Sequence, residues 1–235
     1  MRMGILAAGR GERLARAGIS VPKPLVHVGG KPLIARMIEA GARLGASSVA
    51  CVVNDLDLAV SEFIRRGAWP IPVDLVVKTT ANSMESLFSL APFLAGGPFL
   101  LSTVDAVCGP GMLEGFVAEA AACADASGAL ALTRFVDDEK PLWAAIDERR
   151  RITQIGDAAR NSGYVTAGFY YLTPAAFGEI DRARRKKLNA LRQFLAHLVD
   201  AGYALYGVPV GRTVDVDYPQ DIEKAEACLK ESRCP

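Results

Sequence analysis

The residues best suited to chemistry stand near the start of the chain, in the stretch Leu6-Ala-Ala-Gly-Arg-Gly-Glu-Arg-Leu14. This stretch begins as an apolar, strand-like run and turns at once into a loop with two glycines and two arginines. Glycine lets backbone N–H groups approach an oxyanion closely, and successive N–H groups in such a turn form a nest for phosphate. Arg10 and Arg13 add positive charge there. The stretch therefore indicates a phosphate-binding loop.

The loop departs from two widespread nucleotide-binding motifs. The dinucleotide fingerprint G-x-G-x-x-G needs a third glycine where Leu14 stands, and the P-loop ending G-K-[ST] is absent. By itself, the pair of glycines fits a plain tight turn as well as a phosphate site. The next segment, Val21-Pro-Lys-Pro-Leu25, places Lys23 between two prolines in a stiff segment that cannot become a helix. A lysine held in this way is better aimed at a fixed anion than at solvent.

Aspartates supply the second kind of chemistry. Asp105 directly follows the apolar run 99–104, where an open α/β sheet presents groups to a ligand at its carboxyl edge. A carboxylate buried there is unfavourable unless it binds a cation or a hydrogen-bond donor. Near the C-terminus, strand alternation predicts that Asp215 and Asp217 lie on one face, and Asp221 is expected to cap the next helix or to face solvent. These carboxylates are candidate cation ligands.

Alternating apolar and amphipathic segments must position these residues. Strand-length apolar runs occupy residues 4–8, 48–54, 72–78, 98–104, 128–135 and 165–172. Helical patterns cover residues 32–44, 112–126 and 189–201, and residues 143–147 and 152–155 indicate a hairpin. This alternation is typical of a mostly parallel α/β sheet covered by helices on both faces.

The motifs resemble those of the nucleotidyltransferase superfamily that makes nucleotide-activated sugars and polyols. Its members open with a strand, a loop of the form L-A-A-G-x-G-x-R-L and the segment P-K-P-L, and all of these letters are present as Leu6 to Leu14 and Pro22 to Leu25. The resemblance implies a Rossmann-like, three-layer α/β/α fold of the GT-A-like nucleotidyltransferase type, with a mixed, mostly parallel sheet. It also implies one domain over residues 1–235, with a nucleotide-binding half at about 1–110 and an acceptor-binding half at about 111–235.

The resemblance also implies roles for individual residues. Arg13 would neutralise the triphosphate, Lys23 would steady charge on the reacting phosphate, and both would act with Asp105 as catalytic residues. Asp105 and Asp217 would bind Mg²⁺, with Asp215 as the reserve ligand. The implied nucleotide-binding residues are Leu6, Ala7, Ala8, Gly9, Arg10, Gly11, Arg13, Lys23, Asn82 and Ser86.

The later motifs match more loosely. Asn82, followed by Ser86-Leu87, is closer to cytidylyltransferases that act on choline or inositol phosphates than to the G-T-A form of many sugar-nucleotide enzymes, although Asn82 is also a good helix N-cap. Thr166, Gly168 and Tyr170 match a strand that lies beside the acceptor. Arg134 and Lys140 are further acceptor candidates for which a structural role is the stronger interpretation.

The activity implied is Mg²⁺-dependent transfer of a nucleoside monophosphate from a nucleoside triphosphate, with CTP or UTP favoured, to a small phosphorylated acceptor. A sugar phosphate, a polyol phosphate or a phosphocholine-like compound would serve as the acceptor, and pyrophosphate would be released. The alternatives are a molybdenum-cofactor guanylyltransferase-like enzyme and a nucleotide-sensing domain without turnover. A glycosyltransferase is a weaker alternative, because it usually shows a D-x-D in mid-chain, whereas Ala106 and Val107 follow Asp105.

Composition and charge limit the classes of partner that the chain is expected to bind. The chain has 235 residues, 27 Lys+Arg, 26 Asp+Glu and a net charge of +1, which gives no global field to attract nucleic acid or an anionic membrane. The five cysteines are an odd number without a C-x-x-C spacing, so reduced thiols and a cytoplasmic location are expected. The apolar run at the N-terminus is too short for a signal peptide or an anchor. The oligomeric state stays open, with a homodimer as one candidate.

Overall fold

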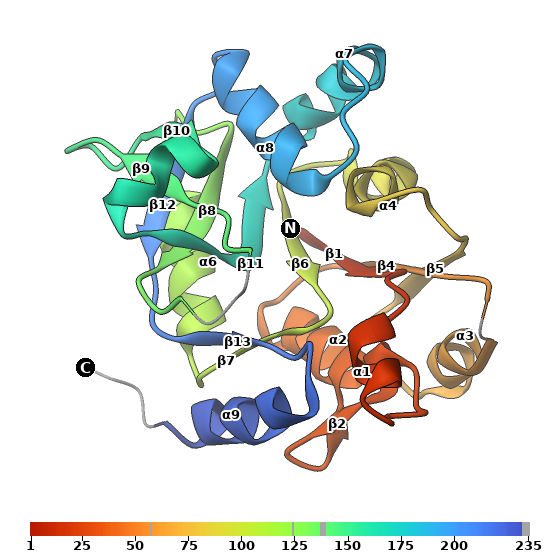
Figure 1. Cartoon of the computed structure of the whole chain (residues 1–235). Coiled ribbons are helices and arrows are strands. Elements are labelled where there is room, and N and C mark those ends of the chain that lie inside the picture. Colours follow the sequence, from red (N-terminus) through yellow and green to blue (C-terminus); the bar gives the residue numbers. More distant parts are fainter. Residues whose placement is uncertain (57, 124, 137–139, 232–235) are drawn as a thin grey trace.

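A seven-stranded mixed sheet forms the centre of the molecule (Figure 1). The computed structural model describes residues 1–56, 58–123, 125–136 and 140–231. The strands lie in the order β12-β8-β11-β6-β1-β4-β5, and β11 runs antiparallel to both of its neighbours while the other pairs are parallel. Their bounds are β1 Arg2–Ala7, β4 Val49–Val53, β5 Val73–Val77, β6 Phe99–Thr103, β8 Gly128–Thr133, β11 Val165–Leu172 and β12 Leu205–Pro209.

Helices and short two-stranded ribbons surround this sheet. The α-helices are α1 Glu12–Arg16, α2 Leu33–Arg43, α3 Leu58–Arg66, α4 Ser83–Ser89, α5 Ala91–Leu94, α6 Met112–Ala122, α7 Ile180–Arg185, α8 Leu191–Asp200 and α9 Pro219–Lys230. The 3₁₀ helices are η1 Lys23–Leu25, η2 Asp157–Ser162 and η3 Pro174–Glu179. The ribbons pair β2 His27–Val28 with β3 Lys31–Pro32, β7 Ala106–Cys108 with β13 Thr213–Asp215, and β9 Ala144–Ile146 with β10 Ile152–Ile155.

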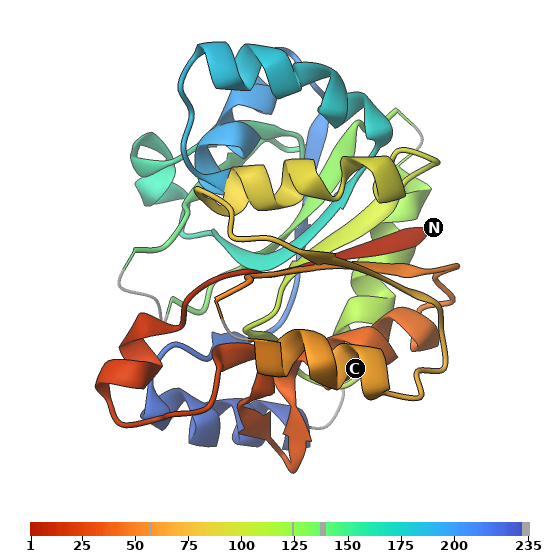
Figure 2. The ribbon, with the colours of Figure 1, turned by 90° about the vertical axis from the view of Figure 1, so that its right-hand side faces the viewer.

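Strand alternation divides the core into two clusters, one on each face of the sheet. In β1, Met3 and Ile5 belong to one cluster and Leu6 to the other, because successive side chains point to opposite faces. The first cluster is completed by α2, α3, α6 and α9, and the second by α4, α5, α7 and α8. Figure 2 shows the resulting helix–sheet–helix layers edge-on. The predicted three-layer α/β/α arrangement with a mixed, mostly parallel sheet is thereby confirmed.

Most of the elements expected from the sequence form within a few residues of their predicted bounds. The three expected helices are α2, α6 and α8, and the expected hairpin is β9–β10. Helix α6 ends at Ala122, earlier than predicted, and residue 124 lies outside the described residues. Elements without a prediction from the sequence include α1, α3, α5, β7 and β12. The helix that Asn82 was expected to begin forms as α4.

Parallel pairing brings the chemically important segments to one edge of the sheet. Strands β1 and β6 are parallel neighbours, with Leu6 opposite Thr103. The loop after Ala7 and the aspartate after β6 therefore leave the sheet side by side. On the other side of β6, β11 runs antiparallel and brings its N-terminal end, near Thr166, to this same edge. The functional residues predicted in both halves of the chain thus meet here.

Candidate active site

The glycine loop packs directly on the lysine of the P-K-P-L segment. Gly11 is the N-cap of α1 and has φ 62°, a left-handed conformation that favours glycine. A Cβ at this position would lie 2.8 Å from the Cβ of Lys23, which is closer than real Cβ contacts allow. Gly11 is therefore needed for both its backbone angle and its small size, and the loop fixes the position of Lys23.

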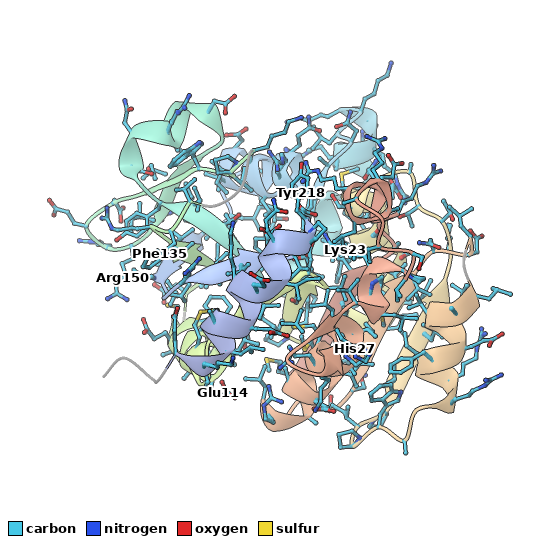
Figure 3. All side chains as sticks on the ribbon, turned by 60° about the horizontal axis from the view of Figure 1, so that its bottom comes forward. Lys23, His27, Glu114, Phe135, Arg150 and Tyr218 are labelled. Carbon is cyan, nitrogen blue, oxygen red and sulfur yellow. The ribbon has the colours of Figure 1, made fainter. Side chains whose placement is uncertain are left out.

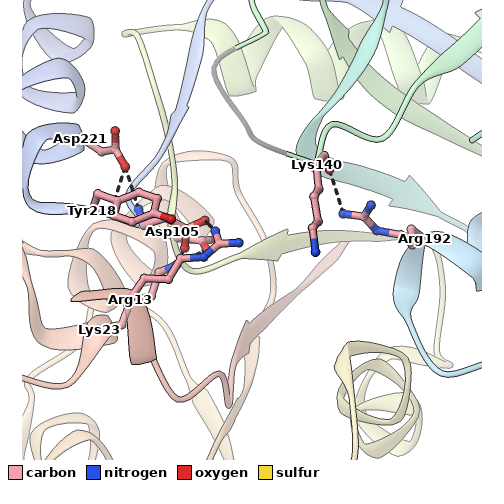
Figure 4. Close-up of polar contacts among 8 residues, drawn as sticks. Arg13, Lys23, Asp105, Lys140, Arg192, Tyr218 and Asp221 are labelled. Atoms are coloured by element: carbon pink, nitrogen blue, oxygen red, sulfur yellow. Dashed lines mark hydrogen bonds and ion pairs between the residues drawn. The ribbon is translucent and has the colours of Figure 1, made fainter. Parts of the chain in front are cut away.

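Lys23 is the centre of a compact ion-pair cluster (Figure 4). Its Nζ donates to Asp105 Oδ2 at 2.5 Å and to Asp217 Oδ1 at 2.6 Å. Arg13 Nη1 donates to Asp217 Oδ2 at 2.6 Å. Lys23 is only 9% exposed, while the side chains of Asp105 and Asp217 are 22% and 29% exposed. Residues that are up to 204 positions apart in the chain thus form one charged group at the surface of the sheet edge.

The pairing keeps the central groups ionised. Burial is the largest influence on the pKa of Lys23 and acts to lower it, but the charges and hydrogen bonds of Asp105 and Asp217 outweigh burial and raise the pKa above its ordinary value. Burial likewise acts to raise the pKa of Asp105, and the charge and hydrogen bond of Lys23, helped by a hydrogen bond from Thr103, hold it below its usual range. The cluster therefore contains a lysine cation and a carboxylate anion at neutral pH.

A turn and a helix cap, rather than a continuing strand, place Asp217. Strand β13 ends at Asp215, and the amide of Asp217 donates back to the Asp215 carbonyl at 3.1 Å. The alternation nevertheless continues past the end of the strand, because Val214 and Val216 are buried while Asp215 and Asp217 both line the cavity, which agrees with their predicted placement on one face. Asp221 accepts hydrogen bonds from the amides of Asp217 and Tyr218 at 3.2 and 2.8 Å, which confirms its predicted capping role at α9. The Tyr218 ring also lies under the Arg13 guanidinium, 5.6 Å from its centroid.

The cluster borders a cavity of about 360 Å³ between the two halves of the chain. In the view of Figure 3, Phe135 lies on one side of this region and Lys23 on the other, with Tyr218 between them. The cavity brings together the following residues that were predicted from the sequence: Arg13, Asp105, Thr166, Gly168, Tyr170, Asp215 and Asp217. The predicted metal-binding and acceptor-binding sets therefore share one space.

Gly168 holds the acceptor strand against the residue that follows Asp105. It has φ +79°, and a Cβ there would lie 2.7 Å from the Cβ of Ala106 and 3.8 Å from Asp215 Oδ1. The pairing of β11 with β8 also shifts register between Thr166 and Tyr170, as expected for a bulge. Glycine permits the close approach that joins the two halves of the site at this point.

Other predicted residues lie at the margins of the cavity or serve the fold. Leu6 and Ala7 are buried in the sheet, whereas Gly9 and Arg10 are exposed on the loop, next to the half-buried Ala8. Asn82 is the N-cap of α4, where its side chain accepts from the Glu85 amide at 3.0 Å. The buried Ser86 hydroxyl lies 2.6 Å from that of Thr80. Neither Asn82 nor Ser86 lines the cavity.

Sequence reasoning missed several residues that line the cavity. Arg192 enters it from the start of α8, and Phe135 and Val136 from the segment after β8. The periodicity of α8 buries Leu191, Phe194, Leu195 and Leu198, which leaves Arg192 outside the core. The helical periodicity in the sequence therefore indicated that Arg192 lies outside the core. Nothing in the sequence indicated that a cavity lies beside it. Of the other acceptor candidates, Arg134 stacks on Tyr164 with 4.2 Å to the ring centroid, and the Lys140 carbonyl accepts from Arg192.

The two carboxylates also satisfy a test for Mg²⁺ binding. Oxygens of Asp105 and Asp217 already converge on one cationic atom, Lys23 Nζ, and both side chains are partly exposed beside the cavity. Mg²⁺ prefers oxygen ligands and usually takes one or two carboxylates together with waters and substrate phosphates. Over the described ranges, no group of three or more His, Cys, Asp or Glu side chains forms an all-protein cage. Asp105 and Asp217 therefore fit an open magnesium site completed by substrate.

Two further predictions from the sequence concern membrane anchoring and the state of the cysteines. None of the helices built by the described residues is long and apolar enough to cross a membrane. Cys51, Cys108, Cys123 and Cys228 are free thiols, and Cys234 lies outside the described residues.

Comparison with known proteins identifies relatives along most of the chain. CMP-5'-(3-aminopropyl)phosphonate synthase of Streptomyces rubellomurinus is 32% identical over 219 residues, which cover 90% of this chain and 33% of that protein. This chain therefore spans about a third of that relative's length. UTP--glucose-1-phosphate uridylyltransferase AglF of Haloferax volcanii is 21% identical over 236 residues, covering 98% of this chain and 97% of that protein. Both relatives have names that denote nucleotidyl transfer.

A solved structure shares the architecture of this chain. The inositol-1-phosphate CTP transferase from T. maritima superposes with a TM-score of 0.81 and 21% identity over 98% of this chain and 96% of that one. This likeness confirms the predicted GT-A-like nucleotidyltransferase fold. A family model described as "MobA-like NTP transferase domain" matches residues 3–200. Since this match runs from within β1 to the last residue of α8, we conclude that the chain belongs to the MobA-like NTP transferase domain family.

Proposed function

We propose that the protein is a Mg²⁺-dependent nucleotidyltransferase that moves a nucleoside monophosphate from a nucleoside triphosphate, CTP or UTP in preference, to a small phosphorylated acceptor. One observation carries this proposal: Arg13, Lys23, Asp105 and Asp217 converge beside a cavity that also contains the acceptor-strand residues. Cations for a triphosphate and oxygen ligands for a metal thus stand at one point. The membership of the family supports the same reaction class.

The reaction joins two anions, so electrostatic repulsion is its main obstacle. An oxygen of the acceptor phosphate attacks the α-phosphorus of the triphosphate, a new P–O bond forms, and the bond to the bridging oxygen of pyrophosphate breaks in line. Pyrophosphate leaves with the electron pair of that bond. The transfer is direct, and no covalent enzyme intermediate is needed. Positioning and charge neutralisation are therefore what the protein must supply.

Arg13 and Lys23 provide fixed positive charge for this step. The loop that ends at Gly11 receives the triphosphate, and Arg13 at the start of α1 neutralises its charge. Lys23 is held by the loop and by two carboxylates, so it meets the α-phosphate without a large loss of side-chain freedom. Groups of this kind commonly contribute about 3 to 4 kcal/mol to transition-state stabilisation.

Asp105 and Asp217 hold the metal ion, with Asp215 as the reserve ligand. Mg²⁺ bound there would supply positive charge that offsets the negative charge of the reacting phosphates. Lys23, which lies against both carboxylates, would then direct its charge to the substrate phosphates. Residues 1–110 bind the nucleotide in this proposal, and residues 111–235 bind the acceptor through Thr166, Gly168 and Tyr170.

Pyrophosphate release tests the proposal. The full chain is incubated with Mg²⁺, each of CTP, UTP, GTP, ATP and dTTP, and a panel of sugar phosphates, polyol phosphates, phosphocholine and phosphonates. Release that requires one triphosphate, one acceptor and Mg²⁺ supports the proposal and names the substrates. Release only with GTP and a molybdenum cofactor would favour the guanylyltransferase alternative. Triphosphate binding without release under any condition would favour a sensing domain.

A further inference from the structure

Helix α8 begins without a cap from its own segment. Its N-cap residue is Ala190, which has no side-chain acceptor, and the first amide of the helix, that of Leu191, donates instead to Ser83 Oγ at 3.0 Å. Ser83 is the first residue of α4 and lies 108 positions earlier in the chain. The residue that caps a helix normally stands directly before it. The start of α8 therefore depends on a side chain from the nucleotide-binding half.

Two further contacts join α4 to the same part of the molecule. Glu85 accepts hydrogen bonds from Nε and Nη2 of Arg184 in α7, at 2.9 and 2.7 Å, and these bonds hold the pKa of Glu85 below its usual range. Phe88 packs edge-on against Phe194 of α8, with 5.0 Å between the ring centroids. Figure 1 shows α4 and α8 as neighbours. A bidentate ion pair and an aromatic pair both depend on orientation, so the two helices hold a defined relative position.

Ser83 stands at the cavity itself. It lines the cavity with Arg13 and Asp105 of the proposed phosphate-transfer site, and Leu191 and Arg192 at the start of α8 line it as well. Strand β5, which leads into α4, is parallel to β4, and β4 is parallel to β1. The segment before Ser83 therefore leaves the sheet at the same edge as the glycine loop. A nucleotide held by that loop and by Arg13 shares the cavity with Ser83.

The Ser83 hydroxyl has hydrogen-bonding capacity left for a ligand. A serine hydroxyl carries one O–H donor and two acceptor lone pairs. The Ser83 oxygen accepts from the Leu191 amide, and its own proton is donated to none of the described residues. The side chain is also exposed at the cavity. Because the two roles use different parts of the hydroxyl, Ser83 can cap α8 and donate to a ligand at the same time.

We propose that Ser83 binds the nucleotide through its O–H proton and thereby stabilises the start of α8, so that nucleotide binding orders the acceptor side of the cavity. The inference rests on the proposed nucleotidyl transfer and adds a link between its two substrate sites. A hydrogen bond to the nucleotide fixes the Ser83 side chain in the position that caps Leu191, and it makes the oxygen a better acceptor. The residue after Leu191 is Arg192, which lines the cavity.

The first experiment follows hydrogen exchange at the start of α8. Exchange of the Leu191 amide is measured by NMR in the full chain, with and without Mg²⁺ and a non-hydrolysable triphosphate analogue. The analogue is that of whichever of CTP, UTP, GTP, ATP and dTTP binds most tightly. We expect the nucleotide to slow this exchange by about 2- to 5-fold, the range that a helix N-cap supplies. In Ser83→Ala, exchange should be faster without nucleotide and should not respond to it.

The second experiment measures nucleotide affinity by calorimetry. Ser83→Ala should raise the Kd of the same analogue by at least about 3-fold, as expected for one lost hydrogen bond. Ser83→Thr, which keeps the hydroxyl, should restore most of the affinity and the exchange response. The matched control is Ser89→Ala, which removes a hydroxyl of α4 that donates to the Ser86 carbonyl outside the cavity, and it should change neither quantity. An unchanged Kd in Ser83→Ala would make Ser83 a structural cap alone and overturn the inference.

Exchange in the glycine loop separates failure of this inference from failure of the proposed reaction. If the nucleotide slows exchange at residues 9–13 but leaves the Leu191 amide unchanged, the link is overturned and the proposed transfer stays intact. If none of the five triphosphates binds in the presence of Mg²⁺, the proposed transfer is wrong, and the inference that rests on it is overturned as well. Slower exchange at both places, lost at Leu191 alone in Ser83→Ala, supports the link.

Discussion

The two walls of the cavity are built in different ways. The nucleotide wall is formed by Arg13, Asp105 and Asp217. Behind it lie the left-handed Gly11 and Lys23, which is 9% exposed, and three short ion pairs join the charged groups, so that each is held by its neighbours. On the acceptor wall, Arg192 makes one described hydrogen bond, to a backbone carbonyl, and Phe135 is more than half exposed. One wall is tightly constrained by its own contacts, and the other leaves its binding groups open.

This difference indicates that phosphate transfer and acceptor specificity depend on different walls of the cavity. The groups proposed for phosphate transfer must be held in place before substrate arrives, because preorganised charge needs no rearrangement during the reaction. The groups proposed for acceptor binding can change from one relative to another without disturbing the Lys23 cluster. Substitutions on the nucleotide wall should therefore reduce kcat for every acceptor, and substitutions on the acceptor wall should change KM for particular acceptors.

The largest effect is expected from Asp105→Asn. The variant keeps the shape of the side chain but loses the negative charge that pairs with Lys23 and is proposed to bind the metal. We expect kcat to fall at least roughly 10³-fold, beyond the loss seen for a single preorganised group because two functions are removed at once. Steady-state pyrophosphate release measures this, and Asp74→Asn in β5, outside the cavity, is the matched control. Near-normal turnover would eliminate the metal assignment.

The same variant should change the response of stability to acid. The pKa of Asp105 is lower in the folded protein than its ordinary value, so its ionised form stabilises the fold above the unfolded pKa of about 3.9, and that contribution is lost as pH falls through the folded value. Asp105→Asn should therefore lose less stability than the wild type when the pH is lowered below about 4. Urea unfolding at several pH values measures the two slopes, and parallel slopes would contradict the ion pair.

Lys23→Gln should have the next largest effect. Loss of the charge removes the fixed cation of the nucleotide wall, and we expect kcat to fall by about 10²-fold with every acceptor. The matched control is Lys31→Gln, which removes a half-buried lysine that pairs with Glu39 away from the cavity. If kcat fell with only one acceptor, Lys23 would act in acceptor specificity. The proposed division between a nucleotide wall for phosphate transfer and an acceptor wall for specificity would then be wrong.

The sequence predicts the residues of the nucleotide wall better than those of the acceptor wall. The nucleotide wall comes from contiguous motifs, 6–14 and 22–25, and from an aspartate at a strand end, so residue order alone indicates its members. The acceptor wall is assembled from β8, β11 and the start of α8, which meet only after β11 inserts antiparallel between β6 and β8. The position of Arg192 depends on that packing. Residue order therefore could not indicate it.

Local backbone details limit sequence reasoning even within good motifs. Asp215 and Asp217 were correctly placed on one face, but β13 ends at Asp215, and the sequence pattern did not indicate where the strand stops. The mixed sheet and the layers were predictable because apolar runs of strand length alternate with helical patterns along most of the chain. Short ribbons such as β7–β13 depend on pairing between distant segments, and no local pattern indicates their partner.

Gly11→Ala should have a smaller effect. It strains the backbone of the loop and displaces Lys23 in the site. The added Cβ meets Lys23 Cβ at 2.8 Å and must adopt φ 62°, so we expect a loss of about 1 to 3 kcal/mol in the free energy of unfolding. Displacement of Lys23 should also lower kcat. Gly97→Ala, where the Cβ meets nothing within 4 Å, controls for the added methyl group in urea unfolding. Equal stability of the two variants would contradict the close packing of loop and lysine.

The smallest effect is expected from Asn82→Ala, at the margin of the nucleotide wall. The Asn82 side chain already accepts a hydrogen bond from the Glu85 amide as the N-cap of α4, so its loss should reduce stability by about 1 kcal/mol, or roughly 2 to 4 °C in Tm for a chain of this size. Asn82→Asp should keep the cap and the stability. If capping is the main role, the KM for CTP stays unchanged in both variants. A KM for CTP that rises in both, with full stability in Asn82→Asp, would instead assign Asn82 to the nucleotide, as the sequence motif predicts.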